Sequence, residues 1–201
     1  MRFTLKCLCV FTAILFCSIA SVHSQQLYVG ANYHPHDDKN PEKIIKDIQL
    51  MKDAGFTVVR MGHLAWDSYE PSEGKFDFAW FDTVMDMMNK AGIKVILDIA
   101  IRPAPIWLHH KYPSIDIVDV NGDVQYPNHR YMEDIGDPMY QKYALRYAET
   151  LTKRYKNHPA LLAFGIDNES GDGRISLPNV LNMLSEKMIT AHAGAIWYRH
   201  G

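Results

Sequence analysis

An amide and a carboxylic acid stand side by side near the end of this chain, directly after an apolar segment. Leu161 to Asp167 reads as a buried strand, and Asn168 and Glu169 follow it. A carboxylic acid in a partly dry pocket is kept protonated by desolvation and can donate a proton to a leaving oxygen. Glycoside hydrolysis uses such an acid together with a second carboxylate, and Asn168 could hydrogen-bond a sugar hydroxyl. An isolated Asn-Glu pair is more often a helix cap, but the preceding strand and the following Gly171 favour a catalytic acid.

A second candidate site is His34-Pro35-His36, after the first expected strand. Two histidines at this spacing resemble the metal pair of amidohydrolases, which binds a divalent ion that activates water. Pro35 and the acidic residues Asp37 and Asp38 also suit an ordinary turn. A metal-dependent hydrolase using His34 and His36 therefore stays open beside the glycosidase hypothesis.

Aromatic side chains follow the expected strands, among them Trp66, Trp107 and Tyr112. Sugars stack on such rings, but neighbouring side chains do so as well, and a single ring of this kind is more often packed in the protein. A non-catalytic module that binds sugars on Trp66 and Trp107 is the third hypothesis.

Charged residues inside two apolar strands need partners. A buried Arg60 requires a carboxylate or several acceptors, so we expect it to brace Glu169 or another carboxylate at the same edge. Asp98 predicts a structural hydrogen-bonding role. The stretch Glu70–Gly74 predicts a turn, and the remaining charge clusters predict solvated surface: His109, His110, Lys153 and Arg154.

The elements that position these residues alternate between strands and helices. Apolar strands are expected at 27–33, 57–61, 93–99 and 161–167, with helices from Asn40-Pro41 to Gly55, over 78–90, from Asp137-Pro138 onward and over 178–192. A long irregular stretch covers 102–136. Strands that are apolar on both faces and separated by helices indicate a parallel sheet.

A doubly wound sheet and a (β/α)8 barrel both fit this order of elements. No Gly-rich phosphate loop follows the first strand, and polar or aromatic residues collect after every strand, where a barrel has its active site. A complete barrel needs about 250 residues. The sequence therefore predicts the N-terminal half of a (β/α)8 TIM barrel, with helices outside, and a sheet that is poorly buried on its own.

The first 24 residues read as a secretory signal peptide. Arg2 and Lys6 precede an apolar run over 7–20, and small residues lead to Ser24. The run is shorter than the roughly 20 residues needed to span a bilayer, and no later segment is apolar enough to do so. Residues 25–201 are then the exported domain, and a periplasmic or secreted location is expected.

Composition narrows the classes of partner. The three cysteines, Cys7, Cys9 and Cys17, all leave with the signal peptide, so neither a disulfide nor a thiolate metal site is expected. The net charge is −2 with His neutral, and loss of the basic leader makes the rest more acidic. This argues against a nucleic-acid partner, which would require a basic face.

Five stretches of the sequence occur in order over most of residues 27–173. They are GANYHP (30–35), VVRMGHLAWDSYEPSEGKFDFAWFD (58–82), AGIKVILD (91–98), PAPIWL (103–108) and IDNESG (166–171). Together they resemble the N-terminal half-barrel of the family 42 glycoside hydrolases, the β-galactosidases. Single stretches also recur in family 35 enzymes and cellulases, so the combination carries the resemblance.

The resemblance implies a retaining β-galactosidase that acts on galactosides or oligosaccharides without a cofactor. Glu169 matches the acid/base proton donor, Asn168 the neighbouring substrate-binding residue and Arg130 a substrate-binding arginine. Arg60 and Trp66 are further candidates for substrate contact. The family's nucleophile is a glutamate at the end of the seventh strand, which this sequence does not reach. We therefore expect this fragment alone to be inactive.

The sequence also departs from the family pattern. Many members carry a zinc ion held by cysteines, and the first of those positions falls near Asp134 here. His36 stands where the family usually has glutamate. Many relatives are cytoplasmic, unlike the location that the leader predicts, and a homotrimer is implied by the resemblance alone.

Overall fold

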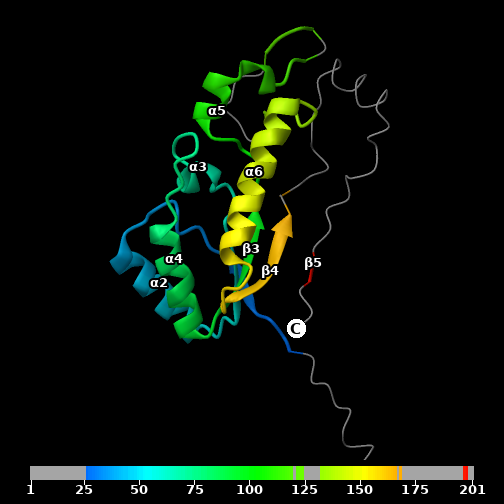
Figure 1. Ribbon diagram of the computed structural model, residues 1–201. Coiled ribbons are helices and arrows are strands. Elements are labelled where there is room, and N and C mark those ends of the chain that lie inside the picture. The colour runs from blue at the N-terminus through cyan, green and yellow to red at the C-terminus, as the bar shows by residue number, and fades with distance from the viewer. Residues whose placement is uncertain (1–25, 120, 125–131, 167, 169–196, 199–201) are drawn as a thin grey trace, which may run out of the picture.

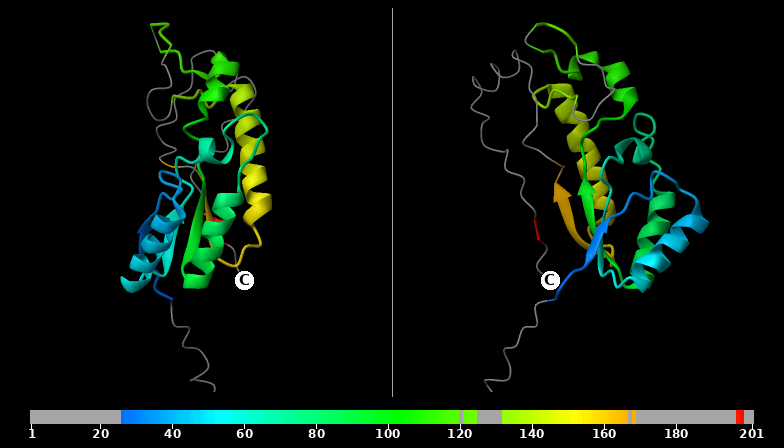
Figure 2. Two further views of the ribbon diagram at one scale, coloured as in Figure 1. Left: turned by 90° about the vertical axis from the view of Figure 1, so that its left-hand side faces the viewer. Right: turned by 180° about the vertical axis from the view of Figure 1, so that it is seen from behind.

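A curved parallel sheet with helices on one face organises the described part of the chain. The computed structural model describes residues 26–119, 121–124, 132–166, 168 and 197–198. Four parallel strands pair in chain order: β1 (Gly30–Asn32), β2 (Val58–Met61), β3 (Lys94–Ile99) and β4 (Leu161–Ile166). The long helices lie on one side of them (Figures 1 and 2): α2 (Pro41–Asp53), α4 (Ala79–Ala91) and α6 (Pro138–Tyr155). This arrangement confirms the predicted half of a (β/α)8 barrel.

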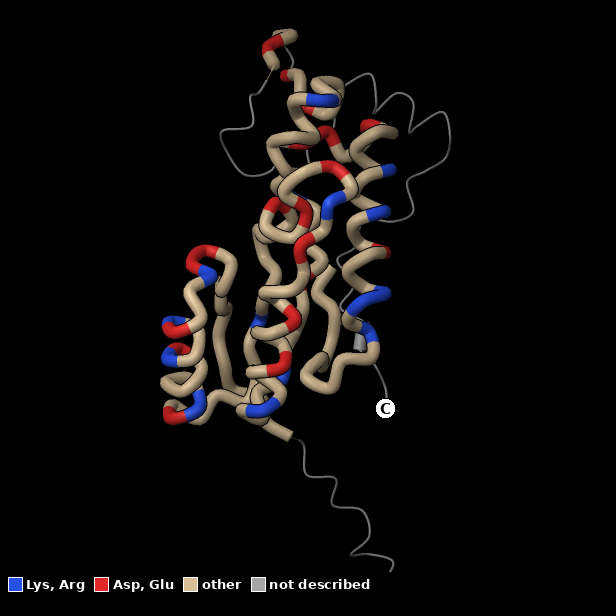
Figure 3. Tube along the Cα trace, turned by 60° about the vertical axis from the view of Figure 1, so that its left-hand side comes forward, with Lys and Arg blue, Asp and Glu red and all other residues tan. Residues whose placement is uncertain are grey.

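The long helices begin and end at the residues whose local chemistry predicts it. The side chain of Asn40 accepts a hydrogen bond from the Glu42 amide at the start of α2, and that of Asp137 accepts two at the start of α6. Such caps satisfy amides that have no partner within the helix. Gly92 ends α4 with a φ of 76°, which glycine adopts without steric cost. Acidic and basic residues are interspersed along the outer face of α2 (Figure 3).

The core lies between the helices and the outer face of the sheet. Along β2 and β3 the outward side chains of Val59, Met61, Val95 and Leu97 are buried. They pack in one cluster with residues of the three long helices: Ile44, Ile48, Phe81, Val84, Met85, Met88, Tyr147 and Leu151. Phe81, Met85, Met88, Tyr147 and Leu151 have no exposed surface.

The inner face of the sheet is much more open than the outer face. All three residues of β1 are exposed, and Ile166 at the end of β4 keeps 42% of its surface accessible. In a complete barrel the inward side chains fill the interior in layers. The prediction that this half buries its sheet poorly is therefore confirmed.

The stretch 102–136, predicted as irregular, contains two short elements. The helix α5 (Ile106–Lys111) follows Pro105, and the 3₁₀ turn η1 (Pro113–Ile115) comes next. Neither has a side-chain cap. They are held instead by burial of Leu108 and Ile115, which are both 0% exposed. A one-turn helix, α3 (Trp66–Tyr69), likewise follows β2.

The last described residues depart from the all-parallel expectation. The two-residue strand β5 (Trp197–Tyr198) pairs antiparallel with Ala163 and Phe164 of β4. The expected helix at 178–192 and the expected signal peptide at 1–24 lie outside the described residues. None of the described helices is long and apolar enough to cross a membrane.

Candidate active site

Side chains from neighbouring strands meet at the carboxyl end of the sheet around Asn168. Arg60 of β2 donates from Nη2 to Asn168 Oδ1 at 3.1 Å. Arg102, after β3, donates from Nη2 to the main-chain oxygen of Asn168 at 3.3 Å. Residues 108 and 66 positions apart in the chain are thus joined at the edge where (β/α)8 barrels have their active sites.

Arg60 is braced by a carboxylate, as the sequence predicts, and the partner within the described residues is Asp98. Arg60 Nη2 forms an ion pair with Asp98 Oδ2 on the neighbouring strand β3. The Asp98 side chain is 1% exposed and that of Arg60 is 27% exposed. The expectation that Asp98 has a polar partner within the sheet is therefore confirmed. Arg102 is also buried, so two guanidinium groups flank the same asparagine.

Two of the predicted site residues lie outside the described part of the chain. They are Glu169, the predicted proton donor, and Arg130, the predicted substrate-binding arginine. Asn168, the residue before Glu169, is described and lies two positions beyond the end of β4. The roles of Glu169 and Arg130 therefore stay predictions.

Of the two roles considered for Trp66, the structure shows packing against other side chains and not sugar stacking. Its ring is fully buried and stacks on Tyr147 of α6, with 4.7 Å between ring centroids. Its Nε1 donates to Glu70 Oε2 at 3.0 Å. Trp107 is also used in packing, because its Nε1 donates to the Glu70 main-chain oxygen at 2.9 Å and its ring meets Tyr143 edge-on. Both rings pack toward α6 rather than toward the open face of the sheet.

The carboxylate of Glu70 is buried and has several polar partners, which the sequence did not predict. The predicted turn at 70–74 is present, with Gly74 N donating to Glu70 Oε1 at 2.7 Å. Glu70 itself is 0% exposed and forms an ion pair with Arg146 of α6. No local signal in the sequence marked this pair, because Arg146 is 35% exposed and stands 76 positions from Glu70.

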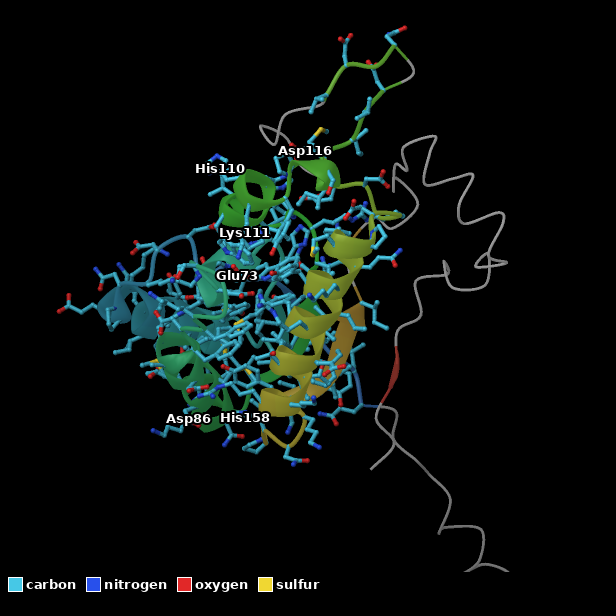
Figure 4. The ribbon with its side chains drawn as sticks, turned by 45° about the horizontal axis from the view of Figure 1, so that its top comes forward. Glu73, Asp86, His110, Lys111, Asp116 and His158 are labelled. Carbon is cyan, nitrogen blue, oxygen red and sulfur yellow. The ribbon has the colours of Figure 1, made fainter. Side chains whose placement is uncertain are left out.

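His109 was expected on the solvated surface, and this expectation is wrong. The residue is 3% exposed, with Nδ1 2.5 Å from Asp116 Oδ1 and Nε2 3.4 Å from Glu133 Oε1. Burial lowers the pKa of His109, but hydrogen bonds to Glu133 and Asp116 outweigh it and raise the pKa above its usual value. The neighbouring His110 is exposed, as predicted. Figure 4 shows Asp116 beside α5, near His110 and Lys111.

The two histidines of the rival site line a pocket at the same edge of the sheet. An open pocket of about 480 Å³ is lined by His34, His36, Asp37, Leu64, Asp67 and Ser68. The rings of His34 and His36 lie 5.4 Å apart between centroids, and burial lowers the pKa of His36. Within the described ranges, no three His, Cys, Asp or Glu side chains are grouped so that they could hold a metal ion. The described residues therefore give no support to a metal-dependent hydrolase.

Comparison with known proteins identifies the family. The sequence profile of glycoside hydrolase family 42, described as beta-galactosidase, matches residues 32–179. The chain belongs to glycoside hydrolase family 42. Beta-galactosidase BbgII of Bifidobacterium bifidum is 37% identical over 147 residues, which are 73% of this chain and 21% of that protein. Beta-galactosidase Pbg of Clostridium perfringens is 38% identical over 141 residues, covering 70% of this chain and 20% of that protein.

Solved structures of family 42 enzymes share the same fold. The cold-adapted β-galactosidase from Rahnella sp. R3 is 27% identical with a TM-score of 0.76, over 84% of this chain and 25% of that one. The family 42 β-galactosidase Gan42B is 31% identical with a TM-score of 0.67, over 70% of this chain and 21% of that one. The chain thus spans about a fifth of the length of the curated relatives.

The zinc ion of many family 42 members does not fit the described residues. Asp134 stands near the first of the family's cysteine positions, and its Oδ1 accepts a hydrogen bond from Gly136 N at 2.9 Å. Asp134 is buried and its carboxylate belongs to the turn that leads into α6. No cysteine is present between residue 18 and the end of the sequence.

Proposed function

We propose that this chain is the N-terminal part of the catalytic barrel of a retaining β-galactosidase. The enzyme would hydrolyse terminal β-D-galactosyl residues of oligosaccharides or other galactosides. The observation that carries this proposal is the contact between Arg60 and Asn168 at the carboxyl edge of the sheet. Family 42 membership supports the same conclusion.

In the proposed mechanism, Glu169 acts twice. As an acid it protonates the glycosidic oxygen while the nucleophile attacks the anomeric carbon, and a covalent galactosyl-enzyme forms. As a base it then removes a proton from the water that hydrolyses this intermediate. Asn168 and Arg130 bind sugar hydroxyls. The nucleophile, about 5–5.5 Å from the acid in retaining enzymes, is expected from a later strand of the barrel.

Replacement of Glu169 by Gln in the full-length protein tests this assignment. We expect turnover of galactosides with poor leaving groups to fall about 10²- to 10⁴-fold, the usual contribution of a general acid–base group. Substrates with activated aryl leaving groups need less protonation and should lose less in the first step. The matched control is Glu149→Gln, because Glu149 lies exposed on α6 and its ion pair within the described residues is with Lys153. Near-normal turnover in E169Q would exclude Glu169 as the acid.

We further propose that the protein acts in the periplasm or outside the cell, since residues 1–24 read as a secretory signal. N-terminal sequencing of the exported protein checks this, with a start near Gln25 expected. The homotrimer implied by family resemblance is checked by light scattering on the full-length protein. A start at Met1, or a monomer, contradicts the respective proposal.

A further inference from the structure

The carboxylate of Asp98 lies below the tip of β4, on the inner face of the sheet. It belongs to the same face as Arg60, whose side chain covers it through their ion pair. His63 Nδ1 lies 3.9 Å from Asp98 Oδ2. Although the inner face is open, Asp98 itself is 0% exposed. A charge in such a position is costly unless it is paired, so the ion pair with Arg60 offsets the cost of burying this carboxylate.

The neighbouring strand leaves room for this carboxylate. Asp98 pairs in register with Gly165 of β4. A Cβ atom built on Gly165 would lie 2.0 Å from Asp98 Oδ1, which is far inside van der Waals contact. The glycine is therefore required for close approach of the carboxylate rather than for a special backbone conformation.

The contacts of Asp98 lead to the orientation of Asn168. The guanidinium of Arg60 has donors only, so it fixes the carbonyl oxygen of the Asn168 amide toward itself. The amide NH₂ group consequently faces away from Arg60 as a hydrogen-bond donor. Arg102 holds the main chain of the same residue. The direction in which Asn168 donates is thus set by where the Arg60 guanidinium lies.

We propose that Asp98 is a positioning residue for galactoside hydrolysis. Its carboxylate fixes Arg60, and Arg60 fixes the direction in which Asn168 donates to the galactosyl group. This inference rests on the proposed function, because it takes Asn168 as a substrate-binding residue. Asp98 itself does not touch the sugar.

A double-mutant cycle in the full-length protein tests the inference. The variants are Asp98→Asn, Asn168→Ala and the two combined, assayed on an activated aryl galactoside so that residual rates are measurable. We expect D98N to lower kcat/KM about 10- to 100-fold, mostly through kcat, because misplacement by about 1 Å can cost 10²-fold. In the N168A background the same change should cost less than about 3-fold, since residues that act through one another are not additive.

A merely structural role for Asp98 gives a different result. D98N would then cost equally in both backgrounds, which overturns the inference, as does a D98N enzyme with normal kcat/KM. The control is Asp86→Asn, which removes a carboxylate that is 64% exposed and pairs with His158. Figure 4 shows Asp86 and His158 far from Asp116 and α5, and D86N should retain normal kinetics.

A spectroscopic measurement separates this inference from the proposed function. In the wild-type protein the Arg60 guanidinium should give NMR signals of hindered rotation, because Asp98 and Asn168 hold it. D98N should bring these signals into fast exchange, whether or not the protein hydrolyses galactosides. Unchanged Arg60 signals in D98N would overturn the inference, whereas an inactive wild-type enzyme with the expected NMR change would count against the proposed function only.

Discussion

Removal of the Glu70 carboxylate should lower the free energy of unfolding by more than removal of an exposed carboxylate on α6. In Glu70→Ala the buried Nε1 of Trp66 loses its acceptor, and an unsatisfied buried donor costs about 1–3 kcal/mol. Arg146 is 35% exposed, so loss of its ion pair adds only about 1 kcal/mol. The Gly74 amide is partly buried and adds less than about 1 kcal/mol. The expected decrease in the free energy of unfolding is about 3 kcal/mol.

Denaturant unfolding followed by circular dichroism measures this change. Glu70→Gln keeps the shape and one acceptor, so about half of the loss is expected. Glu149→Ala is the control, because its exposed pair with Lys153 is worth about 0.3–0.5 kcal/mol. A cycle with Arg146→Ala should give a coupling of about 1 kcal/mol. An E70A protein as stable as the E149A control would refute the argument that Glu70 organises these contacts.

Two further predictions concern Trp66 and His109. Trp66 packs on Tyr147 and donates a hydrogen bond to Glu70. Trp66→Phe should therefore lower the free energy of unfolding by about 1–3 kcal/mol and leave KM for galactosides unchanged. A raised KM with normal stability would contradict this prediction. The pKa of His109 is raised in the folded state, so its contribution to stability is present below its usual pKa of about 6.5 and is lost as the pH rises through the raised value. The stability difference between wild type and His109→Gln should therefore be larger at pH 6 than at pH 9, and a difference that grows with pH would contradict the assignment.

The long helices and the strand order were predictable because their signals are local. Asn40-Pro41 and Asp137-Pro138 mark helix starts within a few residues of chain, and both caps form as predicted. The helix α5 was not predictable in this way. Its stability comes from burial of Leu108 rather than from a cap or a long amphipathic repeat.

The candidate site could be predicted only in part, because its contacts depend on how distant segments pack and not on local signals. Arg60 and Asp98 each stood out as charged residues within apolar strands. Their ion pair depends on the register between β2 and β3, which could not be predicted from the sequence. The role of Trp66 stayed open because an aromatic ring after a strand can stack on a sugar or on a distant side chain. Its partner Tyr147 comes from α6, and only the packing of that helix decides between the two.

Because Asp98 approaches Gly165 closely, the substitutions that each of these positions tolerates depend on the residue at the other. A side chain at position 165 would clash first with the Asp98 carboxylate, which is the group nearest to a Cβ atom built there. A larger residue would therefore be tolerated at position 165 only after Asp98 had been replaced by a smaller residue. Variation at these two sites should therefore arise in a fixed order, with the acid lost first. An engineer who wishes to reshape the inner wall of this barrel would have to change both together.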